Sequence, residues 1–121
     1  MPPTVLVVDD DPAFRRVVVQ LLTLRGFDVV AEVADGESAL EAVRRHRPDS
    51  VLLDVNLPDH TGLCVSRTLT AQAGAPTVVL TSTDSTSFTD EALADCGARA
   101  FVPKERLVRV DLKSLFSAAG T

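Results

Sequence analysis

Five short runs of consecutive apolar residues divide the sequence at nearly regular intervals. The runs start 22 to 27 residues apart, and most of them are rich in β-branched side chains. Runs that are apolar throughout are typical of parallel strands covered on both faces. Each interval accommodates a strand, a helix of about three turns and two short loops. The predicted strands are residues 5–8, 29–31, 51–53, 78–80 and 100–102.

The segments between these runs carry helical signals. Asp11 and Pro12 supply an N-cap and a proline at the first helical position, and apolar residues then recur with helical spacing until Gly26. The predicted helices are residues 12–25, 36–47, 62–72 and 87–96, and a last helix that contains residues 108–119. The face expected for the last helix comprises Val108, Leu112, Leu115, Phe116 and Ala119.

The alternation of strand and helix predicts the fold class. It indicates an open, doubly wound α/β sheet of five parallel strands with five helices. The 121 residues are sufficient for one domain, so we expect a single domain over residues 1–121. Right-handed crossovers place the carboxyl ends of all strands along one edge of the sheet, where ligands bind in such folds.

Charged and polar side chains follow four of the five predicted strands. They are Asp9, Asp10 and Asp11 after the first, Asp54 after the third, Thr81 and Ser82 after the fourth, and Lys104 after the fifth. A single Asp in such a place is more often a helix cap or a solvated loop residue, and Asp11 before Pro12 is interpreted as a cap. Carboxylates from adjacent strands repel one another unless a cation or a proton intervenes, and their oxygens suit Mg²⁺. An ammonium from another strand adds a point charge for an anion such as a phosphoryl group.

Four segments at these strand ends form a specific combination. They are Val7–Asp10, Leu53–Pro58 with Gly62 four residues on, Leu80–Ser82, and Gly97–Lys104. In this order and separation they resemble the receiver domain of bacterial two-component response regulators. The resemblance covers the chain from residue 5 to about residue 119, and it implies a flavodoxin-like fold with strand order 2-1-3-4-5.

The resemblance implies a role for each residue of the expected site. Asp54 would be the phosphoacceptor, a carboxylate nucleophile that forms an acyl phosphate. Asp10, Asp54 and the backbone carbonyl of Asn56 would bind Mg²⁺ directly, and Asp9 would act through a bound water. The phosphoryl-binding residues implied by the family are Thr81, Lys104 and Ser82, the last of which is small enough to leave room for the group.

The resemblance also implies a switch. Phosphorylated Asp54 would draw the Thr81 hydroxyl inward, and the ring of Phe101 would move into the vacated space. The alternative interpretation of Phe101 is a core aromatic residue on the fifth strand.

The sequence departs from the usual family pattern near Lys104. Receivers usually have a proline after this lysine, whereas here Pro103 precedes it and Glu105 follows. A differently shaped loop is therefore expected. Phe101 lacks the hydroxyl of a tyrosine, and His60, close to the expected site, is interpreted as a solvated loop residue.

Composition and charge restrict the classes of partner and the cellular location that we expect. The 17 acidic against 12 basic residues give a net charge of −5, which disfavours direct binding of nucleic acid or an anionic membrane. Part of this acidity belongs to the expected site, where one divalent cation would balance three carboxylates and Lys104. Cys64 and Cys96 are predicted to be reduced core residues. The chain has neither a signal-peptide pattern nor a long apolar run, so we expect a cytoplasmic protein.

The predicted function is that of a signalling module rather than an enzyme. It would receive a phosphoryl group from a sensor histidine kinase or a phosphotransfer protein, which would dock near Phe14, Val17 and Pro103. Phosphorylation would change a face formed by residues 87–96, 99–102 and 106–118, which would contact a downstream protein or a second copy of the chain. The final residues resemble a finished helix with a short tail, which favours a stand-alone receiver. The alternative is the N-terminal half of a longer DNA-binding regulator.

Two further alternatives are disfavoured by particular residues. A phosphatase of the aspartyl-phosphate type would need a second Asp two residues after the nucleophile, where this chain has Asn56. A flavin carrier of the same fold would need a phosphate-binding loop after the first strand, where this chain has three acidic residues that would repel a phosphate.

Overall fold

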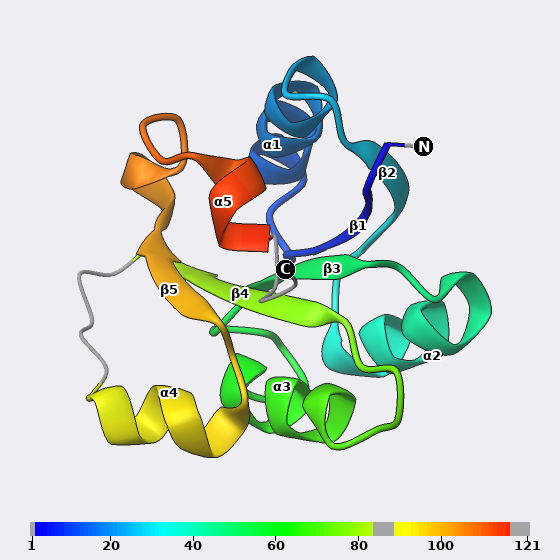
Figure 1. Ribbon diagram of the computed structural model, residues 1–121, viewed down its shortest axis with the longest axis vertical. Coiled ribbons are helices and arrows are strands. Elements are labelled where there is room, and N and C mark those ends of the chain that lie inside the picture. The colour runs from blue at the N-terminus through cyan, green and yellow to red at the C-terminus, as the bar shows by residue number, and fades with distance from the viewer. Residues whose placement is uncertain (1, 84–88, 117–121) are drawn as a thin grey trace.

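A computed structural model describes residues 2–83 and 89–116 of the chain. Five parallel strands form one sheet in the order β2-β1-β3-β4-β5 (Figure 1). The strands are β1 (Thr4–Val8), β2 (Asp28–Val33), β3 (Ser50–Asp54), β4 (Thr77–Ser82) and β5 (Ala100–Pro103). The helices are α1 (Pro12–Leu24), α2 (Gly36–His46), α3 (Gly62–Thr70), α4 (Asp90–Cys96) and α5 (Leu112–Phe116). The predicted fold class and strand order are confirmed.

The sheet separates two apolar cores. Helices α1 and α5 cover one face, and α2, α3 and α4 cover the other (Figure 1). Along β1, Val5 and Val7 contribute to the core beneath α1 and α5, whereas Leu6 and Val8 contribute to the opposite core. Both sets are buried, because successive side chains of a strand point to opposite faces. This two-sided burial explains the unbroken apolar runs in the sequence.

Side-chain caps define where α1, α2, α3 and α4 begin. The predicted cap Asp11 accepts a hydrogen bond from the Ala13 amide at 3.0 Å, and Asp35, Thr61 and Thr89 cap α2, α3 and α4 in the same way. Such caps satisfy amides that have no partner inside the helix. The described part of α4 therefore begins at Asp90, and its predicted start near Ser87 lies outside the described residues.

The prediction that Val108 lies on the last helix is wrong. Val108 is in a turn that follows a 3-10 turn at Lys104–Arg106, and 56% of it is exposed. The guanidinium of Arg25, at the end of α1, donates hydrogen bonds to the carbonyl oxygens of Val108 (2.9 Å) and Val110 (3.1 Å). These carbonyls are therefore held by α1, and this segment forms a turn instead of the first turns of a helix.

Helix α5 begins later than predicted because Asp111 caps it. The Asp111 carboxylate accepts hydrogen bonds from the Ser114 amide (3.3 Å) and the Ser114 hydroxyl (2.9 Å). Leu112 and Phe116 are buried as expected, and Ala119 lies outside the described residues.

The prediction that both cysteines lie in the core is wrong for Cys64. Cys96 is buried, whereas Cys64 is exposed on α3, and both are free thiols. Helix α3 buries Val65, Ser66 and Leu69, so residue 64 faces away from the sheet.

Within residues 2–83 and 89–116, none of the helices has the length and apolarity needed to span a membrane.

Candidate functional site

Strand register brings the predicted site residues to one edge of the sheet. Val8 of β1 pairs with Leu53 of β3, so Asp9, directly after β1, and Asp54, the last residue of β3, come next at the same edge. Asp54 in turn pairs with Thr81 of β4. The pairing of Ser82 with Pro103 brings Lys104 to the same edge.

Asp9, Asp10 and Asp54 form an acidic cluster at this edge. Each offers one carboxylate oxygen, and these atoms all lie within 4.8 Å of one another. Asp9 and Asp54 are buried, with 1% and 4% of each exposed, whereas Asp10 is exposed. Two like charges near a protein surface repel by about 4 kcal/mol at 4 Å, so the cluster favours a cation. Hard carboxylate oxygens are the donors that Mg²⁺ takes, and the residues present fit this ion.

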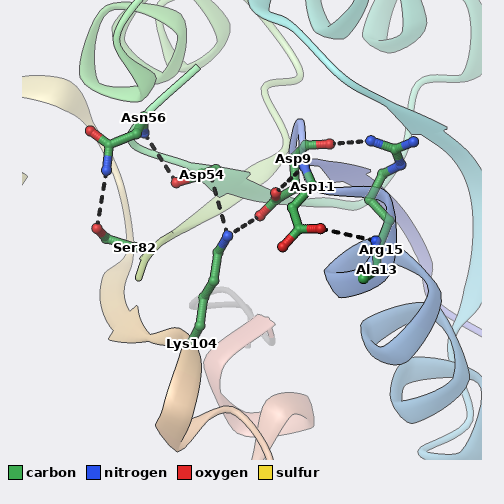
Figure 2. Close-up of polar contacts among 8 residues, drawn as sticks. All are labelled: Asp9, Asp11, Ala13, Arg15, Asp54, Asn56, Ser82 and Lys104. Atoms are coloured by element: carbon green, nitrogen blue, oxygen red, sulfur yellow. Dashed lines mark hydrogen bonds and ion pairs between the residues drawn. The ribbon is translucent and has the colours of Figure 1, made fainter. Parts of the chain in front are cut away.

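Lys104 supplies a positive charge between two of these carboxylates (Figure 2). Its Nζ lies 2.6 Å from Oδ2 of Asp9 and 3.4 Å from Oδ2 of Asp54. The ammonium also lies over the ring of Phe14, 4.2 Å from its centroid, which is a cation–π geometry. Burial alone would lower the pKa of Lys104, but the Asp9 and Asp54 carboxylates outweigh it and raise the pKa. Lys104 is therefore a fixed positive charge at neutral pH.

Asp54 has an environment unlike that of a surface carboxylate. Its Oδ1 accepts a hydrogen bond from the Asn56 amide at 3.0 Å, and its Oδ2 faces Lys104. Burial, aided by the negative charge of Asp9, raises the pKa of Asp54, and the Asn56 amide and Lys104 oppose this rise. The side chain is thus held in one orientation and carries a charge that is incompletely compensated.

The neighbouring loops are tied to the same site (Figure 2). The Asn56 side-chain amide donates to the Ser82 hydroxyl at 3.3 Å, which joins the loop after β3 to the end of β4. In the loop after β1, Oδ1 of Asp9 accepts from the Asp11 amide at 2.8 Å. Arg15 donates to the main-chain carbonyl of Asp9 and contacts Glu32 through its Nε, 3.5 Å away.

Thr81 and Phe101, the two residues of the predicted switch, lie beside this site. The Thr81 hydroxyl is buried and has no hydrogen-bond partner among the described residues. Phe101 is half-buried against the core on the α2, α3 and α4 side of the sheet. A buried hydroxyl without a partner is uncommon and marks a place where an acceptor could bind.

Replacing Thr81 by valine is expected to stabilise the protein. Valine keeps the shape of threonine and removes a buried hydroxyl whose desolvation is uncompensated, so the free energy of unfolding should rise by about 1 kcal/mol. Urea denaturation followed by far-UV circular dichroism measures the change. The matched control is Thr70→Val, which removes a hydroxyl that donates to the carbonyls of Ser66 (2.8 Å) and Cys96 (3.1 Å) and should destabilise the protein. Equal losses in both variants would contradict the expectation.

Two contacts at the site were not predicted from the sequence. Phe14 was predicted to lie on the first helix and to take part in docking of the phosphoryl donor, but its contact with Lys104, 90 residues away, was not predicted. Asp59 binds the N-terminus of α2, where its Oδ1 and Oδ2 accept from the Gly36 and Glu37 amides. Its position after Pro58 is an ordinary turn signal and does not indicate this partner.

The sequence matches the family described as the response regulator receiver domain over residues 5–115. The chain belongs to this family. It is therefore the receiver domain of a two-component response regulator, as the four strand-end segments predicted.

Relatives and solved structures agree with the family. The DNA-binding response regulator MtrA of Mycolicibacterium smegmatis is 43% identical over 110 residues, which cover 88% of this chain and 48% of MtrA. The chain thus spans about half the length of this relative. A LuxR-family two-component response regulator from Aurantimonas sp. SI85-9A1 is 28% identical with a TM-score of 0.82, covering 95% of this chain and 86% of that one. A chain of the CheX-CheY-BeF3-Mg+2 complex from Borrelia burgdorferi is 25% identical with a TM-score of 0.80, covering 96% and 90%.

Proposed function

We propose that this receiver domain accepts a phosphoryl group on Asp54 in the presence of Mg²⁺. The donor would be a sensor histidine kinase or a phosphotransfer protein in the cytoplasm. The observation that carries the proposal is the setting of Asp54, a buried member of the acidic cluster that contacts Lys104. It pairs with Thr81, whose hydroxyl has no hydrogen-bond partner within residues 2–83 and 89–116. A phosphoryl group on Asp54 would supply the acceptor oxygens that this hydroxyl lacks.

The transfer is a displacement at phosphorus. A carboxylate oxygen of Asp54 attacks the phosphorus atom, and the bond from phosphorus to the donor nitrogen breaks with its electron pair remaining on the donor. Phosphoryl transfer depends mainly on alignment and charge neutralisation, so it needs no general base here. Lys104 neutralises charge on the phosphoryl oxygens, and the Asn56 amide orients the attacking carboxylate.

The cation site follows from the same residues. Asp10, Asp54 and the main-chain carbonyl of Asn56 would hold Mg²⁺, and Asp9 would act through water. When bound, Mg²⁺ stabilises the negative charge of the transferring group. The related Borrelia burgdorferi complex contains Mg²⁺ and BeF3 by its name, which supports this choice of cation.

The output would be a change of surface rather than catalytic turnover. In the phosphorylated state the Thr81 hydroxyl donates to a phosphoryl oxygen, and Phe101 moves toward the space that Thr81 leaves. The surface affected comprises α4, β5 and α5, and it would contact a downstream protein or a second copy of the chain. The donor would dock near Phe14, Val17 and Pro103; 59% of Val17 is exposed on α1.

Intact-protein mass spectrometry after incubation with acetyl phosphate and Mg²⁺ tests the proposal. We expect a gain of one phosphoryl group, no gain when the Mg²⁺ is chelated, and reduction of residue 54 to homoserine by borohydride, because borohydride reduces acyl phosphates. No gain from acetyl phosphate, or reduction at a different residue, would contradict it. The chelated sample is the matched control for transfer that does not depend on a cation.

The length of its relatives supports a second candidate output. MtrA is named a DNA-binding response regulator, and this chain covers 48% of it. We propose as the alternative to a stand-alone receiver that this domain controls a DNA-binding domain in a longer protein. The natural reading frame distinguishes the two: a stop codon after residue 121 supports the stand-alone receiver, and continuation into a DNA-binding domain supports the alternative.

A further inference from the structure

The loop between β3 and α3, residues 55–61, is fastened to the N-terminus of α2. Oδ1 of Asp59 accepts a hydrogen bond from the Gly36 amide at 2.8 Å, and its Oδ2 accepts from the Glu37 amide at 3.0 Å. Nε2 of His60 lies 3.2 Å from Oε2 of Glu37 and adds a second contact to the same helix. Helix α2 already has a local cap, because Asp35 accepts from the Ser38 amide at 2.8 Å. Asp59 therefore joins two separate parts of the chain.

The loop is also closed on itself, so its tip and its base are connected. Asn56 and Thr61 form an isolated antiparallel bridge across it, and the Gly62 amide donates to the Val55 carbonyl at 2.7 Å. Asp59 lies in the tip beyond this bridge. The base carries Asn56, whose amide orients the Asp54 carboxylate at 3.0 Å. A displacement of the tip would thus be transmitted to the residue that orients Asp54.

The contact between the loop and α2 is close because Gly36 has no side chain. A Cβ atom on Gly36 would lie 2.9 Å from Val65, 3.0 Å from His60 and 3.2 Å from Asp59. Hydrogen bonding from the Gly36 amide lowers the pKa of Asp59, so its carboxylate remains an ionised acceptor in mildly acidic solution. The absence of a side chain at Gly36 and the ionised carboxylate of Asp59 therefore both favour a close contact between α2 and the loop.

We propose that Asp59 is a positioning residue for the metal site: it fastens the Asn56 loop to α2 and keeps Asn56 in register with the acidic cluster. This inference rests on the proposed function, because it assigns Asn56 to the Mg²⁺ site. Residues that orient metal ligands without touching the metal commonly change its affinity by about 10- to 100-fold when they are replaced.

Calorimetric titration with Mg²⁺, without a phosphoryl donor, tests the proposal. The chain has no Trp and no Tyr, so calorimetry replaces the usual intrinsic fluorescence. We expect Asp59→Ala to weaken Mg²⁺ binding about tenfold. Asp59→Asn keeps one acceptor oxygen and should recover part of the affinity. Gly36→Ala should also weaken Mg²⁺ binding, because its added methyl group pushes the loop away from α2 while the Asp59 carboxylate is still present.

The matched control is Asp35→Ala, which removes a cap from the same end of α2 without touching the loop. It should leave the Mg²⁺ affinity within about twofold of the wild type, because the loss of a cap alone acts on helix stability. Equal weakening by Asp35→Ala and Asp59→Ala would overturn the proposal, since it would show a general effect of the helix end.

Hydrogen exchange in metal-free protein gives an independent measurement. Asp59→Ala should accelerate exchange at the amide of Asn56 as well as at those of Gly36 and Glu37, whereas Asp35→Ala should act at Ser38. Acceleration confined to Gly36 and Glu37, with unchanged Mg²⁺ affinity, would overturn the proposal. If the wild-type protein binds no Mg²⁺, the result contradicts the proposed function instead. In that case hydrogen exchange at the Asn56 amide is the measurement that tests whether Asp59 positions Asn56.

Discussion

An Asp54→Asn variant is expected to gain no phosphoryl group from acetyl phosphate and yet to melt at a higher temperature than the wild type in metal-free buffer. The first effect follows because the asparagine amide is a poor nucleophile at phosphorus, so the loss should be complete. Intact-protein mass spectrometry measures it. The second effect follows from the electrostatics of the buried carboxylate.

The sign of the stability change comes from the pKa of Asp54. Burial and the negative charge of Asp9 raise this pKa above the usual value of 3.8, so the folded protein binds the proton more tightly than the unfolded chain does. The free energy of unfolding therefore falls as pH rises from 3.8 through the folded-state pKa, and the ionised group remains destabilising at neutral pH. Asparagine removes this charge, and Lys104 keeps its 2.6 Å contact with Asp9.

Differential scanning calorimetry in EDTA measures the stability change. We expect the melting temperature to rise by about 4 °C at neutral pH, which corresponds to about 1 kcal/mol in a domain of this size. The difference from the wild type should shrink as the pH falls through the raised folded-state pKa of Asp54, because the carboxyl group becomes protonated there. The matched control is Asp28→Asn, an exposed acidic residue at the start of β2, which should retain phosphorylation and the wild-type melting temperature. A destabilised Asp54→Asn variant would contradict this electrostatic explanation.

The strand-end residues could be predicted from the sequence because topology alone brings them together. In a parallel sheet with right-handed crossovers, the carboxyl ends of the strands share one edge whatever the loops do. Once the strands were predicted correctly from the apolar runs, four residues could be placed at this edge: Asp9, Asp54, Thr81 and Lys104. Residue types with evident chemistry then indicated an acidic cluster and a cation.

The contacts that were missed depend on partners distant in sequence. Val108 has a helical spacing with Leu112, yet its carbonyl is bound by Arg25, which is 83 residues away. Asp59 binds amides 22 and 23 residues earlier in the chain. Periodicity and capping rules describe only neighbours along the chain, so they cannot reveal such competitors for a backbone group.

Gly62→Ala is expected to destabilise the protein and to impair phosphorylation together. A Cβ atom on Gly62 would clash with the main-chain oxygen of Asp54 and would lie 2.7 Å from the Cα of Val55. Both obstacles are backbone atoms, so no side-chain rotation relieves the clash, and the start of α3 must move away from the end of β3. Overpacking of this kind costs about 1–3 kcal/mol, although alanine is otherwise the better helix former.

The same displacement moves the backbone that carries Asp54, the proposed phosphoacceptor. Misplacement of a reacting group by about 1 Å can cost about 100-fold in rate, so phosphorylation by acetyl phosphate should slow well beyond what the fraction of unfolded protein explains. Rates are measured by intact mass at a temperature where circular dichroism shows the variant folded. The matched control is Gly74→Ala, where φ is +70° and nothing lies within 4 Å of the added Cβ. That variant incurs only the backbone strain of a left-handed residue and should phosphorylate at the wild-type rate. A Gly62→Ala variant that is destabilised but phosphorylates normally would show that the clash is absorbed by α3 without reaching Asp54.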